Sequence, residues 1–467
     1  MTPSTITVRL AGLKNFLVDS NIAWRDRAIV IITALSFALS IIIKERGAII
    51  ALLLLPLLFF YPYGAAGWRV IIARWRSPAY LIFYGFLAVL LLSLVVNFFM
   101  GTVIARSLFI HAIFIHGIWV LGRVLLLMLV AAPLLWLWQT KPLLRTITLD
   151  LIAALSLGVM VLLIIAIETN HLTRLHFRND QYSENVAILF LLLFPLMMAK
   201  NRLAWLCLPL IILLHAPFMT VGGWAIGYGT ARLWTLALLI MPLIFFFTPW
   251  WQGWSRRARI FLFILLVILY IFTIGFLLVS GLIFHPTAEH PSLLLTLIEK
   301  IGYDSHSISE RLKIWHFVGY YVAQDSWGAW LGHGMNIMRY LPAVDNNFST
   351  HILGLIPFQA DAQEFVYIEQ PHFVWIELLL DGGVLALLLL LGFFAALLWL
   401  LMVNQPRHPA TRASFAFFIT FLLCFILTNS IYAFWQYFMG TIALLLLWSN
   451  TTPTAQKIKT TSKGVKT

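Results

Sequence analysis

The run WIELLLDGGVLALLLLLGFFAALLWLLM at positions 375–402 decides the class of fold to which the chain belongs. A helix needs about 20 mostly apolar residues to cross a bilayer, and this run of 28 residues exceeds that length. Similar runs recur along the chain of 467 residues, of which 61% are hydrophobic and only 10% are charged. A soluble globule with so few charges would be unable to cover its surface, since typical soluble domains are about 25% charged.

The same composition excludes intrinsic disorder and collagen-like repeats. A membrane β-barrel is built from alternating segments of about ten residues, whereas the apolar runs here are long and unbroken. Both cysteines, Cys207 and Cys424, lie inside apolar runs, so no disulfide framework is expected. The sequence therefore predicts an all-α, polytopic membrane protein.

Twelve runs are candidates for membrane-spanning helices. They lie near 28–44, 48–63, 78–100, 115–138, 148–168, 185–199, 204–219, 232–248, 258–283, 375–402, 413–429 and 432–449. Several are shorter than a full span, so tilting or flanking residues must complete them. Because backbone polar groups cannot remain unpaired in lipid, each run is expected to be helical.

The distribution of Lys and Arg orients these helices through the positive-inside rule. If the N-terminus is cytoplasmic, the cytoplasmic side receives 20 of the 31 positive residues and the opposite side receives ten. The remaining one, Arg123, falls inside the fourth predicted span. Both termini are therefore predicted to be cytoplasmic, and the net charge of +13 indicates membrane orientation rather than nucleic-acid binding.

One loop is much longer than the others. Residues 284–371 form an extracytoplasmic segment of 88 residues, with nine of the 18 carboxylates and six of the 13 His residues. A loop of this length is expected to be functional, and its apolar stretches predict short helices packed on the membrane domain. The predicted organisation is membrane helices one to nine in 1–283, the large periplasmic loop in 284–371, helices ten to twelve in 372–449, and a cytoplasmic tail in 450–467.

The sequence contains no motif for a nucleotide or a metal ion. The pattern GxxxxGK[ST] of ATP-binding loops is absent, as are HExxH and CxxC. The His residues of the large loop also lack metal-ligand spacing. We therefore expect neither a metal ion nor another cofactor.

Two stretches contain the residues most suited to chemistry. The first is Ser307-Ile-Ser-Glu-Arg311-Leu-Lys-Ile-Trp315, followed by Leu331-Gly332-His333-Gly334-Met335. The second is Gln370-Pro-His372-Phe-Val-Trp-Ile-Glu377-Leu-Leu-Leu-Asp381-Gly382-Gly383, which opens the tenth predicted span.

In order and topology these stretches resemble the family of O-antigen ligases and O-antigen polymerases. That family has an Arg with a Trp four residues on, then a Gly-x-Gly, both in a large periplasmic loop. A His follows where the chain re-enters the membrane, with an acidic residue nine positions later and a Gly two beyond that. Those places are filled here by Arg311 and Trp315, Gly332 and Gly334, His372, Asp381 and Gly383.

The match extends to a further Arg and departs from the pattern at two positions. The family has an Arg at the periplasmic edge upstream of the loop, and Arg232, which opens the eighth predicted span, is the best candidate here. An Asn often follows the family's His, whereas this chain has Phe373. A further Gly expected three residues after Gly383 is Ala386.

The resemblance implies an inverting, metal-independent glycosyltransferase with a GT-C-like fold in the Gram-negative inner membrane, its active site facing the periplasm. Such proteins transfer a glycan from an undecaprenyl-pyrophosphate carrier to an acceptor hydroxyl. His372 is then expected to be the base, since imidazole has an unperturbed pKa near 6.5. Arg311 and Arg232 are expected to bind pyrophosphate, because Arg keeps its charge and its planar fork of donors matches phosphate oxygens.

Further residues are candidates for binding the substrate: Trp315, Lys313, Arg339 and Arg123. A charge inside a span, such as that of Arg123, is expensive and usually faces a protein interior or a cavity. An ion pair of Arg123 with Glu168 or Asp150 is the alternative. The glycines at 332 and 334 are expected to allow a tight turn, and Asp381 to cap or orient the start of a helix.

Structural roles are the competing interpretation of the catalytic candidates. His372 also fits an interfacial histidine at a helix start. Arg311 also fits an exposed ion pair with Glu310 or Asp304, and Arg232 an anchor at the membrane interface.

Other functions fit parts of the sequence. An O-antigen polymerase shares the Arg and His chemistry but uses a second carrier-linked unit as acceptor, and a protein-glycosylating oligosaccharyltransferase is related. A secondary transporter or a flippase of lipid-linked oligosaccharide also fits twelve spans, but leaves the long loop unexplained. We prefer the O-antigen ligase, with a carrier-linked glycan donor, a lipid A-core acceptor and membrane lipids as its partners.

Overall fold

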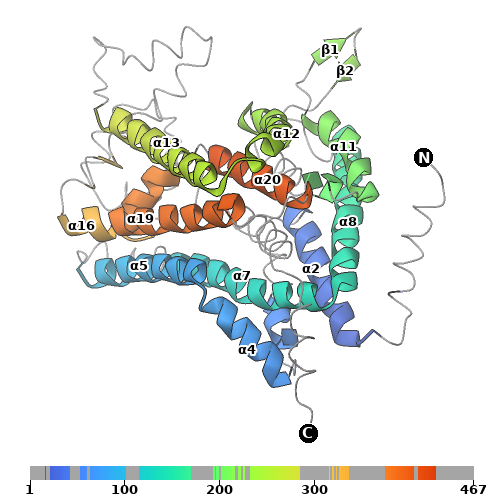
Figure 1. The fold of residues 1–467 in the computed structure, drawn as a ribbon, viewed down its shortest axis with the longest axis horizontal. Coiled ribbons are helices and arrows are strands. Elements are labelled where there is room, and N and C mark those ends of the chain that lie inside the picture. Colours follow the sequence, from blue (N-terminus) through green and yellow to red (C-terminus); the bar gives the residue numbers. More distant parts are fainter. Residues whose placement is uncertain are drawn as a thin grey trace.

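The computed structural model describes residues 16, 22–42, 53–59, 64–100, 115–169, 193–194, 196–198, 201–215, 219–221, 224–226, 232–283, 315, 318–319, 322, 326–335, 374–403 and 409–426. Within them the helices are α2 (Trp24–Ile42), α4 (Gly64–Trp75), α5 (Pro78–Met100), α7 (Ile115–Thr140), α8 (Pro142–Glu168), α11 (Arg202–His215), α12 (Arg232–Gln252), α13 (Arg256–Ile283), α16 (Ser326–Leu331), α19 (Val374–Val403) and α20 (Pro409–Ile426). Figure 1 shows their arrangement.

Four of the described helices are long and apolar enough to cross a membrane. They are Pro78–Phe99, Pro142–Glu168, Arg256–Phe276 and Val374–Met402. Each coincides with a run predicted from the sequence, which confirms the prediction of membrane-spanning helices at these places. Leu129–Thr140 and Leu203–Leu214 are shorter apolar helices within two further predicted spans. The total of about twelve spans stays a prediction, since runs such as 432–449 lie outside the described residues.

The described secondary structure is helical, as predicted, apart from one short strand pair. Strands β1 (Met219–Val221) and β2 (Trp224–Ile226) pair in antiparallel register, with Met219 opposite Ile226 and Val221 opposite Trp224. The two residues between the strands are Gly222 and Gly223. A Gly-Gly pair favours the two-residue turn of a β-hairpin, because both glycines tolerate positive φ. The rest of the described secondary structure is helical.

Helices α5 and α19 lie side by side and form the centre of the apolar core (Figure 1). Two glycines lie at their contact: a Cβ on Gly85 would meet Leu389 at 3.7 Å, and one on Gly392 would meet Ile82 at 3.8 Å, both ordinary van der Waals distances. Small residues at helix contacts are typical of membrane proteins, where packing rather than water exclusion drives association. The ring centroids of Phe83 and Phe393 lie 4.9 Å apart across the same contact.

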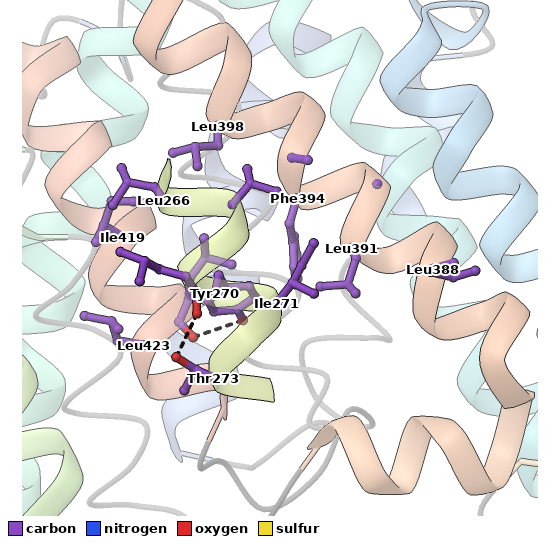
Figure 2. A pocket seen from close by; sticks show the side chains of 15 residues that line it. Leu266, Tyr270, Ile271, Thr273, Leu388, Leu391, Phe394, Leu398, Ile419 and Leu423 are labelled. Atoms are coloured by element: carbon purple, nitrogen blue, oxygen red, sulfur yellow. Dashed lines mark hydrogen bonds between the residues drawn. The ribbon is translucent and has the colours of Figure 1, made fainter. Parts of the chain in front are cut away.

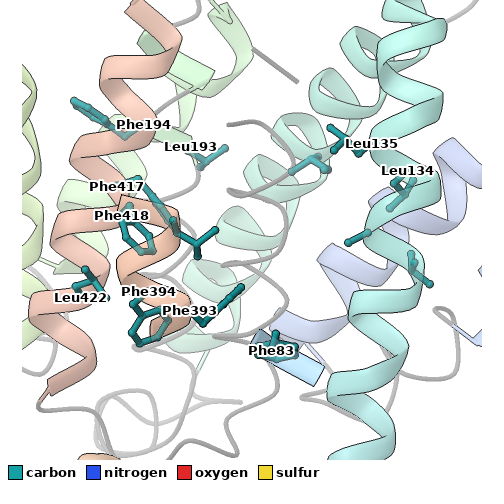
Figure 3. Close-up of a cluster of buried hydrophobic side chains, with 14 of the residues drawn as sticks. Phe83, Leu134, Leu135, Leu193, Phe194, Phe393, Phe394, Phe417, Phe418 and Leu422 are labelled. Carbon is teal, nitrogen blue, oxygen red and sulfur yellow. The ribbon is translucent and has the colours of Figure 1, made fainter. Parts of the chain in front are cut away.

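A second group of helices lies on the other side of α19: α13 and α20 pack against α19, and α12 packs against α20. The Phe394 ring of α19 lies 6.1 Å from the Phe418 ring of α20, in an edge-to-face arrangement. Figure 3 shows both rings in the buried apolar cluster. On its outer face α13 presents exposed apolar side chains such as Phe261 and Phe272. Such a face suits a hydrocarbon solvent rather than water.

Three contacts mark one end of the molecule: Arg74 with Gln139, Lys141 with Asp26, and Arg259 Nη1 donating to the Met402 carbonyl oxygen at 3.3 Å. They join the end of α4 to the end of α7, the α7–α8 corner to the start of α2, and the start of α13 to the end of α19. We call this the basic end, because its contacts are made by Arg and Lys side chains.

Candidate functional site

The Gly-x-Gly turn after α16 and the start of α19 meet through their backbones. The amide of His333 donates to the Leu380 carbonyl oxygen at 2.7 Å, and the amide of Gly334 donates to the Asp381 carbonyl oxygen at 3.3 Å. We call this contact, made by 332–334 and 380–383, the glycine junction. Two motifs that the sequence identified separately, 47 residues apart, are therefore in direct contact.

Two glycines make this contact possible. Gly332 has φ +76° and Gly383 has φ +67°, in the left-handed region that favours glycine. A Cβ on Gly332 would overlap the Asp381 carbonyl group, and a Cβ on Gly383 would overlap the carbonyl group of Trp330. The backbones are therefore too close for any side chain at either position. Gly383 also interrupts the helical conformation of α19, which kinks there.

Two polar side chains of α5 hold the junction from the opposite side. Ser93 Oγ donates to the Asp381 carbonyl oxygen at 2.6 Å, and Asn97 Nδ2 donates to the Gly332 carbonyl oxygen at 3.0 Å. Asn97 Nδ2 also donates to the Ser93 carbonyl oxygen at 2.8 Å. Ser93 and Asn97 are four residues apart and therefore share one face of α5. We call this pair the α5 clamp.

The α5 clamp was not predicted from the sequence. Its signal was present, because Ser93 and Asn97 are polar residues spaced by one helical turn within an otherwise apolar span. Polar groups inside a membrane span are costly unless they find a partner.

Asp381 is fully buried, and Glu377, one turn earlier on α19, is almost fully buried. The sequence predicts that Asp381 caps or orients the start of a helix. In the structure its carbonyl oxygen is the acceptor that joins α5 and the turn at 332–334. Glu377 was not singled out. Burying a carboxylate costs free energy unless it is paired or hydrogen-bonded. The structure therefore constrains which side chains fit at these two positions.

The glycine junction lies away from the basic end. Asp381 precedes Met402 by 21 residues on α19, which is about 30 Å along a helix axis. On α5, Ser93 and Asn97 lie far from Pro78, whose end of the helix follows α4. The positive-inside rule predicts that the basic end is cytoplasmic and that the junction faces the other side.

The predicted catalytic residues fall largely outside the described part of the chain. His372 and Arg311 lie outside the described residues, as do the substrate-binding candidates Lys313 and Arg339. Arg232 is the first residue of α12, and the structure describes its backbone but not its side chain. The other end of α12 contacts α20 near its start, through Trp251 and Phe415. Arg232 therefore begins α12 at the end opposite that contact.

The two remaining substrate-binding candidates have described side chains. Trp315 is buried in the apolar core with Val318 and Val322, a spacing that places all three on one helix face. Arg123 is half-buried on α7. Of the two acids considered as its partners, Asp150 accepts a hydrogen bond from Asn201 Nδ2 at 2.7 Å. Among the described residues, no group of three or more His, Cys, Asp and Glu side chains is suited to hold a metal ion.

An apolar cavity of about 460 Å³ lies between α13, α19 and α20 (Figure 2). It is lined by Leu266, Val267, Leu269, Tyr270, Ile271, Thr273, Leu388, Leu391, Gly392, Phe394, Ala395, Leu398, Ile419, Leu422 and Leu423. The hydroxyls of Tyr270 and Thr273 donate to the carbonyl oxygens of Leu422 (3.3 Å) and Leu269 (2.8 Å), respectively. With its two hydroxyls engaged in this way, the lining is suited to a hydrocarbon chain rather than to a polar ligand.

No protein-family model matches this chain, and no curated protein matches it. The resemblance to O-antigen ligases and polymerases therefore stays a prediction from the sequence motifs.

Proposed function

We propose that the chain is an O-antigen ligase-type glycosyltransferase with about twelve membrane spans and a GT-C-like fold. In this proposal it transfers a glycan from undecaprenyl pyrophosphate to a hydroxyl of a lipid A-core sugar, at the periplasmic face of a Gram-negative inner membrane. The observation that carries the proposal is the glycine junction. It supports one shared site, because two motifs defined only by family resemblance touch through paired backbone hydrogen bonds.

The proposed chemistry is a direct displacement at the anomeric carbon. The acceptor hydroxyl oxygen forms the new glycosidic bond while the bond from the anomeric carbon to the pyrophosphate oxygen breaks, with inversion. The hydroxyl proton passes to His372, which precedes the first residue of α19 by two positions. Arg311 and Arg232 stabilise the negative charge that develops on the departing pyrophosphate.

The junction supports this arrangement through its place in the chain. His372 lies eight residues before Leu380 and nine before Asp381, so a fixed start of α19 fixes where the chain leaves the membrane domain. Positioning of this kind matters, because small misplacements of a catalytic group lower the rate strongly. The α5 clamp adds a third element to the same support.

The apolar cavity supports a place for the carrier. Its nearest lining residue on α19, Leu388, follows Asp381 by seven residues, which is about 10 Å along the axis. In the proposal, part of the isoprenoid chain occupies this cavity while its pyrophosphate lies at the level of the junction.

The proposal is tested by reconstituting the full chain in liposomes with a carrier-linked glycan and a lipid A-core acceptor. We expect His372→Ala to reduce transfer at least 100-fold. The matched control, His306→Ala, removes a histidine of the same predicted loop outside both motifs and should retain transfer. Equal rates of glycan transfer for His372→Ala and wild type would show that His372 is not the base.

The same preparation separates the alternatives. Extension of carrier-linked units with the lipid A-core left unglycosylated would identify a polymerase instead. Movement of the carrier-linked glycan across the bilayer without any new glycosidic bond would identify a flippase and exclude the proposed transfer.

A further inference from the structure

Five cations from three parts of the chain gather at the basic end. Arg25 and Arg27 lie in the first turn of α2, Arg74 in the last turn of α4, and Lys141 and Arg145 at the α7–α8 corner. Two contacts join these three parts of the chain: Lys141 pairs with Asp26 in the first turn of α2, and Arg74 donates to Gln139, two residues before Lys141. We call these five residues the basic corner.

The basic corner has an excess of positive charge. Asp26 is the carboxylate placed among the five cations, it is 5% exposed, and Lys141 already pairs with it. The Gln139 side chain that accepts from Arg74 is neutral. The formal charges of these five cations and Asp26, counted alone, sum to +4. Charge of this density favours an anion, and more so where water is partly excluded.

The arginines of the corner are recessed rather than fully solvated. Arg25, Arg27, Arg74 and Arg145 are all half-buried. Burial lowers the pKa of the Arg74 guanidinium, with a smaller opposing contribution from Tyr80. Guanidinium groups recessed in this way keep their forked donors in few orientations, which suits the oxygens of a phosphate group.

Exposed apolar side chains border the same corner. Trp24, beside Arg25, is 69% exposed, and Leu143, two residues after Lys141, is 62% exposed. On α4, Val70 and Ile72 are also exposed. A ligand that joins phosphate to hydrocarbon matches both parts of this surface, whereas a free phosphate ion matches only the cations. Trp at such a boundary is typical of the membrane interface.

We propose that the basic corner binds the headgroup of an anionic phospholipid, with the acyl chains against the apolar border. Basic pockets between membrane helices at the cytoplasmic side recognise such lipids. A lipid with two phosphates, as in cardiolipin, fits the charge of the corner best. This inference is independent of the transfer reaction and concerns the opposite end of the molecule.

The test measures binding of cardiolipin to the full, delipidated chain in neutral detergent by native mass spectrometry. Arg74→Gln with Arg145→Gln should weaken binding about 30-fold, from about fivefold for each lost cation. The matched control is Arg256→Gln with Arg257→Gln, which removes the same charge from two exposed arginines at the start of α13. We expect the control to bind within twofold of wild type.

Two further arms keep the test decisive. Leu143→Glu places a negative charge at an exposed position of the apolar border and should weaken binding even if the double arginine variant fails to fold. Inorganic phosphate at the same concentration should not displace cardiolipin. The proposal is overturned if the control pair weakens binding as much as the corner pair, if phosphatidylcholine binds equally well, or if phosphate competes.

Discussion

Gly332→Ala tests whether the glycine junction is a rigid contact. The new Cβ would stand at φ +76°, which costs about 1 kcal/mol for a residue other than glycine. It would also overlap the Asp381 carbonyl group. Relieving that overlap requires separating the two backbones, which breaks the hydrogen bonds from His333 and Gly334 at about 1 kcal/mol each. The junction should therefore be destabilised by about 3 kcal/mol.

This destabilisation can be measured as faster hydrogen exchange at the amides of His333 and Gly334, detected by mass spectrometry. A loss of about 3 kcal/mol in the free energy of local opening corresponds to an exchange rate about 100-fold faster. Gly158→Ala is the matched control: it lies inside α8, and a Cβ there meets nothing within 4 Å. The control should be neutral or stabilised by about 0.5–1 kcal/mol through helix propensity. Unchanged protection of the His333 amide in Gly332→Ala would refute the proposed contact.

Three further perturbations follow from other parts of the structure. Asn97→Leu removes one bond of the α5 clamp and leaves a buried carbonyl oxygen without its donor, so amide exchange at the glycine junction should accelerate by about tenfold, equivalent to about 1–2 kcal/mol. Ala395→Trp narrows the apolar cavity and should raise the KM for a carrier-linked donor without lowering the thermal unfolding midpoint, whereas Leu385→Trp, outside the lining, should alter neither. Asp26→Asn should lower the free energy of unfolding, measured by thermal denaturation, by only about 1 kcal/mol, because the Lys141 side chain is 47% exposed and water can solvate it. A decrease above about 3 kcal/mol, as expected for a fully buried ion pair, would contradict this interpretation.

The sequence predicted the long membrane helices well, because hydrophobic length alone determines them. The predicted runs 78–100 and 375–402 correspond to α5 (Pro78–Met100) and α19 (Val374–Val403) within one residue at each end. The kink at Gly383 and the strand pair at 219–226 depend on backbone conformations at glycines, which hydropathy does not report.

The site was predicted only in part. The motif glycines were identified by resemblance, but their contact and its support by Ser93 and Asn97 depend on tertiary packing between α5 and α19. Likewise, the positive-inside rule assigned Arg74 and Lys141 to one side of the membrane. That rule does not say which of those cations lie close to one another. The structure shows this through the contacts with Gln139 and Asp26.

In the proposed reaction, a glycan leaves a lipid carrier and becomes bonded to a second lipid. The most direct measurement follows a labelled glycan on undecaprenyl pyrophosphate in liposomes that contain the purified chain and a lipid A-core acceptor. We predict that the label moves to the acceptor in a new glycosidic bond of inverted anomeric configuration, with release of the carrier pyrophosphate. If the label remains on the carrier in the presence of the acceptor and the folded protein, the proposed transfer is contradicted.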